Sequence, residues 1–244
     1  MAAPTPLFTL KNLTFQHHMS PMKIGTDALL LGAYPKFIAK GDQVLEVGSG
    51  CGIITLMTHK QYPDASFTCL DIDENAFQEC QINILQNGLE DMVKSVLGNV
   101  KDFHLDQGRI YNVVISNPPF FTSEMKPNNE SLKKAKHTDH LSINELAGSV
   151  NILLNDGGFF YVILPIAESQ QIIDIFINMD INLVERMDIR SVESKECFRS
   201  ILVFKKKGQK ENLILKQMTL YNSSQRNDWT KEYRQLLQNF KEFN

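Results

Sequence analysis

The stretch VLEVGSGCGI, residues 44–53, decides the fold that this chain is expected to adopt. It opens with an apolar run, interrupted only by Glu46, of the kind found in strands that a parallel sheet buries on both faces. Apolar residues then recur at helical spacing from Ile53 onward. Between strand and helix lie three glycines, Gly48, Gly50 and Gly52. Strand, glycine turn and helix in this order form the βα unit typical of nucleotide-binding α/β folds.

The glycine turn indicates what kind of ligand would approach it. Its spacing is G-x-G-x-G rather than the G-x-G-x-x-G of dinucleotide-binding enzymes. Glu46 lies two residues before Gly48, and its carboxylate would repel a pyrophosphate. The pattern therefore favours a ligand that carries an amino group.

Polar residues also end the next two predicted strands. Asp71 follows the apolar run 67–70, about 20 positions after the glycine turn, where an acidic residue is expected to bind a ribose diol. We place the neighbouring Ile72 in the same candidate cofactor site. Asn99 ends the following strand, and it is interpreted either as a reader of an adenine edge or as an ordinary loop asparagine.

The stretch ISNPPFF, residues 115–121, supplies the candidate catalytic group. Two prolines end the strand 111–115, because neither has an N–H group to donate to a ladder. The Asn117 side-chain oxygen and the Pro118 carbonyl can both accept hydrogen bonds from one –NH2 group, and Pro119 keeps them rigid. Phe120 can stack on a base. The alternative is a strand followed by a simple Pro-Pro turn.

Two further stretches each allow two interpretations. Residues 19–34 form either a loop and helix that pack on the sheet, or a cofactor mouth lined by Lys23, Thr26 and Asp27, with Thr26 or Asp27 capping the helix. Residues 126–137 form either a solvated loop or a phosphate-binding flap. The flap residues would be Lys126, Lys133, Lys134, Lys136 and His137.

Composition narrows the class of protein. The chain has 244 residues, 43% of them hydrophobic, and a net charge of −3, which is typical of one globular α/β domain. It contains neither a long apolar run nor a signal-peptide pattern, and its four cysteines form no C-x-x-C pair. We therefore expect a cytoplasmic monomer with reduced cysteines, no membrane contact and no metal site.

Predicted strands alternate with helices along the chain, which indicates a mostly parallel sheet with helices on both faces. We expect one domain, residues 1–244, with an N-terminal extension or lid at 1–40 and a flexible substrate flap at 122–141. Residues 205–208 predict a hairpin turn, and residues 228–243 predict a helix.

Together the glycine turn, Asp71 and the Asn-Pro-Pro-Phe motif resemble the class I S-adenosylmethionine-dependent methyltransferases. More narrowly, the chain resembles the bacterial tRNA1(Val) adenine N6-methyltransferases in almost its whole length. The likeness lies in MKIGTDALLLGAY (22–34), VLEVGSGCGI (44–53), LDIDENAFQECQIN (70–83), ISNPPFF (115–121), AKHTDHL (135–141) and GGFFYVILP (157–165).

This resemblance implies a Rossmann-like fold with a seven-stranded sheet, S-adenosylmethionine as cofactor and tRNA as substrate. It implies methyl transfer to N6 of an adenine, expected to be adenine 37, without a metal or a strong base. It also favours a cofactor role for Lys23, Thr26 and Asp27, with Asn117 contacting cofactor and base, and an RNA-binding role for the lysines of the flap.

Four other functions were weighed. A protein glutamine N5-methyltransferase presents the same –NH2 group but usually has an N-terminal helical domain, for which 40 residues are too few. A DNA adenine methyltransferase needs a target-recognition insert that this chain lacks. Similar rRNA guanine N2-methyltransferases tend to be longer, and a non-catalytic scaffold would not need the Asn-Pro-Pro-Phe acceptors.

Overall fold

The computed structural model describes residues 7–107, 111–119, 141–208, 212–225 and 227–243. The strands are β1 (Phe8–Leu10), β2 (Leu13–Phe15), β3 (Gln43–Val47), β4 (Ser66–Asp71), β5 (Val93–Leu97), β6 (Tyr111–Ser116), β7 (Leu154–Pro165), β8 (Ile181–Arg190), β9 (Cys197–Lys206) and β10 (Ile214–Thr219). The helices are α1 (Thr26–Ala33), α2 (Ile53–Gln61), α3 (Glu74–Gln86), α4 (Val100–Gln107), α6 (Ile143–Leu153), α7 (Ile166–Ile177) and α8 (Lys231–Leu237).

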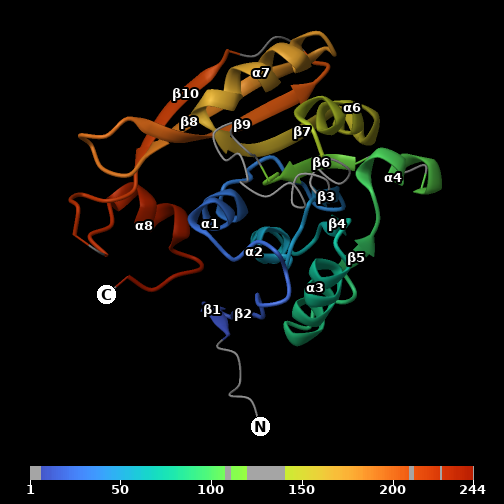
Figure 1. Ribbon diagram of the computed structural model, residues 1–244, viewed down its shortest axis with the longest axis horizontal. Helices are drawn as coiled ribbons and strands as arrows, with labels where there is room; N and C mark the ends of the chain where they lie inside the picture. The colour runs from blue at the N-terminus through green and yellow to red at the C-terminus, as the bar shows by residue number, and fades with distance from the viewer. Residues whose placement is uncertain (1–6, 108–110, 120–140, 209–211, 226, 244) are drawn as a thin grey trace, which may run out of the picture.

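A mostly parallel sheet forms the centre of the molecule, in the order β10-β8-β9-β7-β6-β3-β4-β5 (Figure 1). It has eight strands rather than the expected seven, because β10 adds to the edge in parallel with β8. Only β9 runs antiparallel to its neighbours β7 and β8. The predicted hairpin turn at 205–208 is wrong, because the strand that follows pairs with β8 and not with β9.

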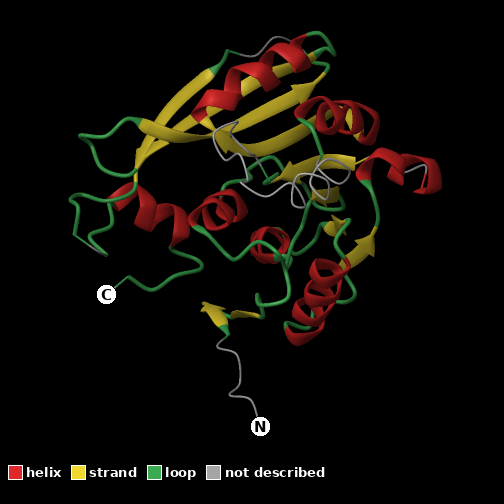
Figure 2. Ribbon diagram, viewed as in Figure 1, coloured by secondary structure: helices red, strands yellow, loops and turns green. Residues whose placement is uncertain are grey.

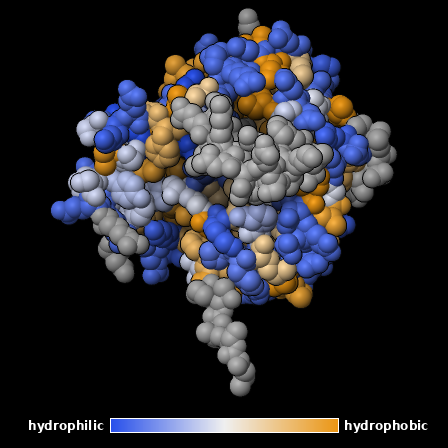
Figure 3. Space-filling model, viewed as in Figure 1, coloured by the Kyte–Doolittle hydropathy of each residue, from blue (hydrophilic) through white to orange (hydrophobic). Residues whose placement is uncertain are grey.

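Helices cover both faces of this sheet, as the alternating pattern predicts (Figure 2). One core joins α1, α2, α3 and α8 to the sheet, and the other joins α4, α6 and α7. In the first core Leu30 and Leu31 of α1 are fully buried, so this helix is part of the core. On the face seen in Figure 3, hydrophobic residues are scattered among hydrophilic ones.

Local signals set most helix ends. The Asp73 side chain accepts a hydrogen bond from the Ala76 N–H group, and Ser142 forms a capping box with Glu145. The expectation that Thr26 or Asp27 caps α1 is wrong, since Gly25 holds the cap position and makes no side-chain bond. The C-terminal helix is shorter than expected and begins after Thr230, whose hydroxyl caps it.

The register of the sheet aligns the strand ends that carry the candidate site. Val47 of β3 pairs with Leu70 of β4 on one side and with Ser116 of β6 on the other. The Ser116 hydroxyl also donates to the Val47 carbonyl oxygen over 2.9 Å. The glycine turn, Asp71 and Asn117 therefore lie together at the carboxyl ends of neighbouring strands, where open α/β folds bind ligands.

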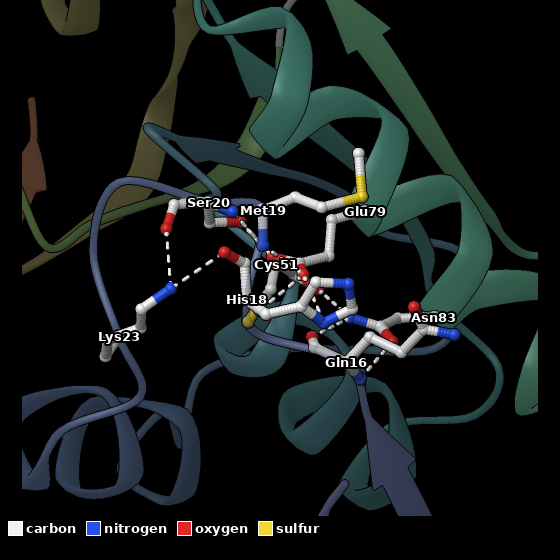
Figure 4. A network of polar contacts seen from close by, with 8 residues as sticks. All are labelled: Gln16, His18, Met19, Ser20, Lys23, Cys51, Glu79 and Asn83. Carbon is white, nitrogen blue, oxygen red and sulfur yellow. Dashed lines mark hydrogen bonds and ion pairs between the residues drawn. The ribbon is translucent and has the colours of Figure 1, made fainter. Parts of the chain in front are cut away.

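A ladder of polar side chains on α3 holds the N-terminal segment 14–20 (Figure 4). Glu79 is fully buried and accepts hydrogen bonds from the backbone N–H groups of His18, Met19 and Ser20. One and two turns further on, Asn83 bonds both backbone groups of Gln16, and Asn87 does the same for Thr14. These bonds satisfy backbone groups of Thr14 in β2 and of residues 16–20, which have no regular structure of their own.

The charge on Glu79 makes this attachment sensitive to pH. Burial alone would raise the pKa of Glu79, but the hydrogen bonds from Ser20, Met19 and His18 outweigh it and hold the pKa below its usual value. A carboxyl group with a lowered pKa stabilises the fold above its unfolded pKa of about 4.3, and this stabilisation is lost as pH falls through the folded pKa.

We expect Glu79→Gln to lower the free energy of unfolding by about 2–3 kcal/mol at pH 7, because charged hydrogen bonds are lost. Urea titrations should show that the difference in free energy of unfolding between wild type and variant shrinks below about pH 4, since the wild-type side chain then becomes protonated and is neutral like the glutamine. Glu90→Gln, which changes an exposed glutamate just beyond the same helix, is the control. A gap of equal size at pH 7 and at low pH would show that the charge is unimportant.

Candidate functional site

The glycine turn forms an open cradle between β3 and α2. A Cβ atom added to Gly48 or Gly50 would meet nothing within 4 Å, so a ligand can approach the backbone there. Gly52 serves packing instead, because its added Cβ would lie 2.7 Å from the Cys80 Sγ atom of α3. All three glycines have positive φ, which other residues rarely adopt.

Glu46 lies beneath this cradle, 1% exposed. One carboxylate oxygen, Oε2, accepts hydrogen bonds from the Thr55 N–H group over 2.9 Å and from the Thr55 hydroxyl over 2.5 Å. The other oxygen, Oε1, is buried and has no hydrogen-bond partner among the described residues. Burial raises the pKa of Glu46 to about 8, against the bonds from Thr55. A ligand with an ammonium group would supply the missing partner and favour the ionised carboxylate.

Asp71 is tied to the glycine turn. Its Oδ2 atom accepts from the Gly50 N–H group over 2.7 Å, and its Oδ1 atom accepts from the Asp73 N–H group over 3.0 Å. Burial raises the pKa of Asp71, and these backbone bonds oppose the rise. The next side chain, Ile72, is 53% exposed and offers an apolar surface beside the carboxylate.

Asn99 has a local structural partner. Its side-chain oxygen accepts a hydrogen bond from the Lys101 N–H group over 3.0 Å, at the start of α4. The side chain thus acts as a helix cap. Its –NH2 group makes no hydrogen bond among the described residues and remains available to a ligand.

A cavity of about 520 Å³ opens at the end of β6 and includes Asn117, Pro118 and Pro119 in its lining. Within the described part of the chain, no group hydrogen-bonds the Asn117 side chain. Pro118 is buried and Pro119 is exposed. The amide therefore lies at the cavity wall without a hydrogen bond to any other described residue, on a backbone that two prolines restrict.

The N-terminal candidates Lys23, Thr26 and Asp27 line this same cavity. The Lys23 ammonium group donates to the carbonyl oxygens of His18 and Ser20, over 3.0 and 3.4 Å, so it is held against the segment that Glu79 binds (Figure 4). None of the glycine-turn residues, Glu46, Asp71, Ile72 or Asn99 lines it. The structure thus places the candidates in two groups at the carboxyl ends of the strands: those that line the cavity, and those around the glycine turn.

Residues that the sequence analysis did not select also line the cavity. They come from the end of β8, from β9 and from the end of β10: Ser191, Phe198, Arg199, Leu220 and Tyr221. Arg199 forms an ion pair with Asp27, with 2.8 Å between Nε and Oδ2. The two residues are 172 positions apart, so no local pattern indicates the pair.

The remaining candidates lie outside the described residues. They are Phe120, Lys126, Lys133, Lys134, Lys136 and His137. Their proposed roles rest on the sequence.

Solved structures of similar shape are methyltransferases. A predicted O-methyltransferase from Agrobacterium tumefaciens superposes with a TM-score of 0.63 at 13% identity, over 86% of this chain and 95% of that one. A methyltransferase from Pyrococcus furiosus gives 0.57 at 21% identity, over 80% of this chain and 90% of that one. At these identities the likeness shows the fold alone.

Sequence comparison identifies the class and then the family. Residues 19–176 match the model of the methyltransferase small domain, so the chain contains a methyltransferase domain. A tRNA1(Val) (adenine(37)-N6)-methyltransferase from Phocaeicola vulgatus is 31% identical over 83% of this chain and 85% of its own length. One from a Shewanella species is 33% identical over 79% and 81%. The chain belongs to the family of the tRNA1(Val) (adenine(37)-N6)-methyltransferases.

The methyl donor is S-adenosylmethionine, as expected. The residues present fit this group: the glycine cradle is open, and the buried Oε1 atom of Glu46 lacks the partner that an amino group would supply. The described residues contain neither a cluster of three or more His, Cys, Asp or Glu suited to a metal nor a helix long and apolar enough to cross a membrane.

Proposed function

We propose that this enzyme methylates N6 of adenine 37 in tRNA1(Val). The observation that carries the proposal is the Asn117 amide, which lies at the wall of a cavity and has no described hydrogen-bond partner, one strand from the glycine turn. An adenine N6 amino group needs acceptors of this kind. The relatives from Phocaeicola vulgatus and Shewanella are named for the same substrate.

In the proposed complex, Gly48 and Gly50 border the methionine end of the cofactor, and Glu46 accepts from its amino group. Asp71 holds the ribose hydroxyls, and Ile72 packs on the adenine ring. Lys23, Thr26 and Asp27 shape the mouth between cofactor and substrate. When bound, the cofactor supplies an electrophilic methyl carbon on a positively charged sulfur.

The chain's own contribution is to orient the nucleophile. The target adenine leaves the RNA stack and enters the pocket, where Phe120 stacks on its ring. The oxygens of the Asn117 side chain and the Pro118 carbonyl accept hydrogen bonds from the two N6 N–H groups. These bonds favour the pyramidal amine and free its lone pair to attack. The N6 lone pair would form the new N–C bond with the methyl group that a bound cofactor supplies, and the cofactor sulfur would keep the electron pair of the broken S–C bond. The methylated nitrogen then loses one proton to water, so no strong base is required.

The substrate assignment is tested with unmodified tRNA1(Val) transcripts and labelled cofactor. The expected result is one methyl group per tRNA, located at position 37, and none when adenine 37 is replaced by guanine. Equal labelling of both transcripts would contradict the assignment. Labelling of added protein or DNA instead of tRNA would mean that the enzyme is a methyltransferase with a substrate of another class.

We further expect the lysines of residues 126–137 to contact RNA phosphates. Replacing Lys133, Lys134 and Lys136 by alanine should weaken tRNA binding and flatten its salt dependence by about one unit of slope per lost phosphate contact. The charge-matched control replaces three exposed lysines elsewhere, Lys60, Lys94 and Lys231. Equal salt slopes for the two triple variants would mean that the 126–137 lysines only face solvent.

We also propose that the enzyme acts as a monomer in the cytoplasm, where tRNA is found. Light scattering during gel filtration should give the 27.8 kDa mass of one chain. A mass of twice that value would contradict this part of the proposal.

A further inference from the structure

One wall of the cavity comes from a part of the chain outside the shared methyltransferase domain. The family model ends at residue 176, whereas Ser191, Phe198, Arg199, Leu220 and Tyr221 all follow it. Asn117 lines the same cavity, whereas the glycine turn, Glu46 and Asp71 do not. The wall formed by β8, β9 and β10 is therefore placed to select the substrate and not to bind the cofactor.

An aromatic ring lies on this wall. Phe198 lines the cavity and remains 39% exposed, although burial normally stabilises a phenylalanine in a folded protein. Tyr221, which lines the same cavity, stacks on Trp229 with 4.5 Å between ring centroids, so the lining holds a second, packed aromatic side chain. Aromatic rings at an open cavity are the usual platforms for unstacked bases.

The Arg199 side chain packs against Phe198. Its guanidinium carbon lies 5.5 Å from the centre of the Phe198 ring, and its Nη1 group donates to the Phe198 carbonyl oxygen over 3.2 Å. The ion pair with Asp27 fixes the same side chain to α1. Among the described residues the Nη2 group has no hydrogen-bond partner, so its two N–H bonds could be donated to a phosphate.

We propose that Phe198 stacks on the nucleotide next to the target adenine and that Arg199 holds the ring in place and contacts the adjoining phosphate. This inference rests on the proposed tRNA substrate and adds a residue that determines RNA binding. A flipped adenine leaves its neighbour unstacked, and a ring at the cavity wall replaces the lost stacking partner. Phe198 touches no reacting atom in this arrangement, so it acts on binding and not on the methyl-transfer step.

The experiment compares wild type and Phe198→Ala on tRNA1(Val) assembled from synthetic halves, either intact or abasic at one of the two nucleotides beside adenine 37. With intact tRNA, the KM for RNA should rise about tenfold in the variant, since tenfold corresponds to about 1.4 kcal/mol and stacking is worth about 1–3 kcal/mol. The kcat and the KM for S-adenosylmethionine should not change. One of the abasic substrates should raise the KM of wild type by a similar factor but leave that of Phe198→Ala unchanged.

Phe37→Ala is the matched control, because Phe37 is exposed to a similar extent, 42%. It lines a separate pocket near the starts of β3 and β6. Phe198→Tyr should keep a KM close to that of wild type. An unchanged KM in Phe198→Ala, or abasic penalties equal in both proteins, would overturn this inference while leaving the proposed function intact. If wild type transferred no methyl group to intact tRNA, the proposed function itself would fail.

Discussion

Replacing Asn117 by alanine should reduce kcat about 100- to 1000-fold, which corresponds to about 2.7–4 kcal/mol for one preorganised catalytic contact. The variant removes an acceptor from the cavity wall and leaves the backbone of β6 and its prolines in place. Because the affected interaction forms with the adenine amino group, the Kd for S-adenosylmethionine should change far less than kcat. Single-turnover methylation of tRNA1(Val), together with calorimetry of cofactor binding, measures both quantities.

Two further variants sharpen this result. Asn117→Asp keeps oxygen acceptors at the same position and should retain more activity than Asn117→Ala. Asn178→Ala removes an exposed asparagine that does not line the cavity and should behave as wild type. Normal turnover in Asn117→Ala would show that the amide has no part in the reaction.

Replacing Asp71 by alanine should weaken binding of S-adenosylmethionine by about 1.5–3 kcal/mol, or roughly 10- to 150-fold in Kd, the range for hydrogen bonds to charged groups. Two losses combine here. The ribose hydroxyls lose their proposed acceptor, and the Gly50 N–H group loses the 2.7 Å bond that fixes the glycine turn. Calorimetry at fixed pH measures the affinity directly.

Asp71→Asn separates these two contributions. It keeps one side-chain oxygen for the Gly50 N–H group but removes the charge, so its affinity should fall between those of wild type and Asp71→Ala. Asp91→Ala, an exposed aspartate elsewhere, is the control. An unchanged Kd in Asp71→Ala would remove this residue from the cofactor site.

The parts of the fold that could be predicted are those that short stretches determine. A strand, a glycine turn and a helix can be inferred from VLEVGSGCGI, because burial periodicity and backbone freedom are local properties. The bounds of α3 and its Asp73 cap follow in the same way. Once the strands are known to be parallel and adjacent, the polar residues that end them must share one edge of the sheet.

Contacts between distant segments could not be predicted. The Arg199–Asp27 ion pair joins β9 to α1, and the Glu79 ladder joins α3 to residues 14–20. Each depends on how elements pack after the chain has folded. The position of β10 beside β8 is of the same kind, because a turn at 205–208 does not say which strand the next one joins. These contacts hold the cavity lining from β8, β9 and β10 against α1 and attach the N-terminal segment to α3.

The nucleoside formed by the purified enzyme tests the central claim most directly. The protein is incubated with methyl-labelled S-adenosylmethionine and tRNA from a strain lacking its gene, and the RNA is digested to nucleosides. We predict that the label is found in N6-methyladenosine and that Asn117→Ala, folded and able to bind the cofactor, forms almost none. Label in another methylated nucleoside, or equal N6-methyladenosine from Asn117→Ala, would contradict the account.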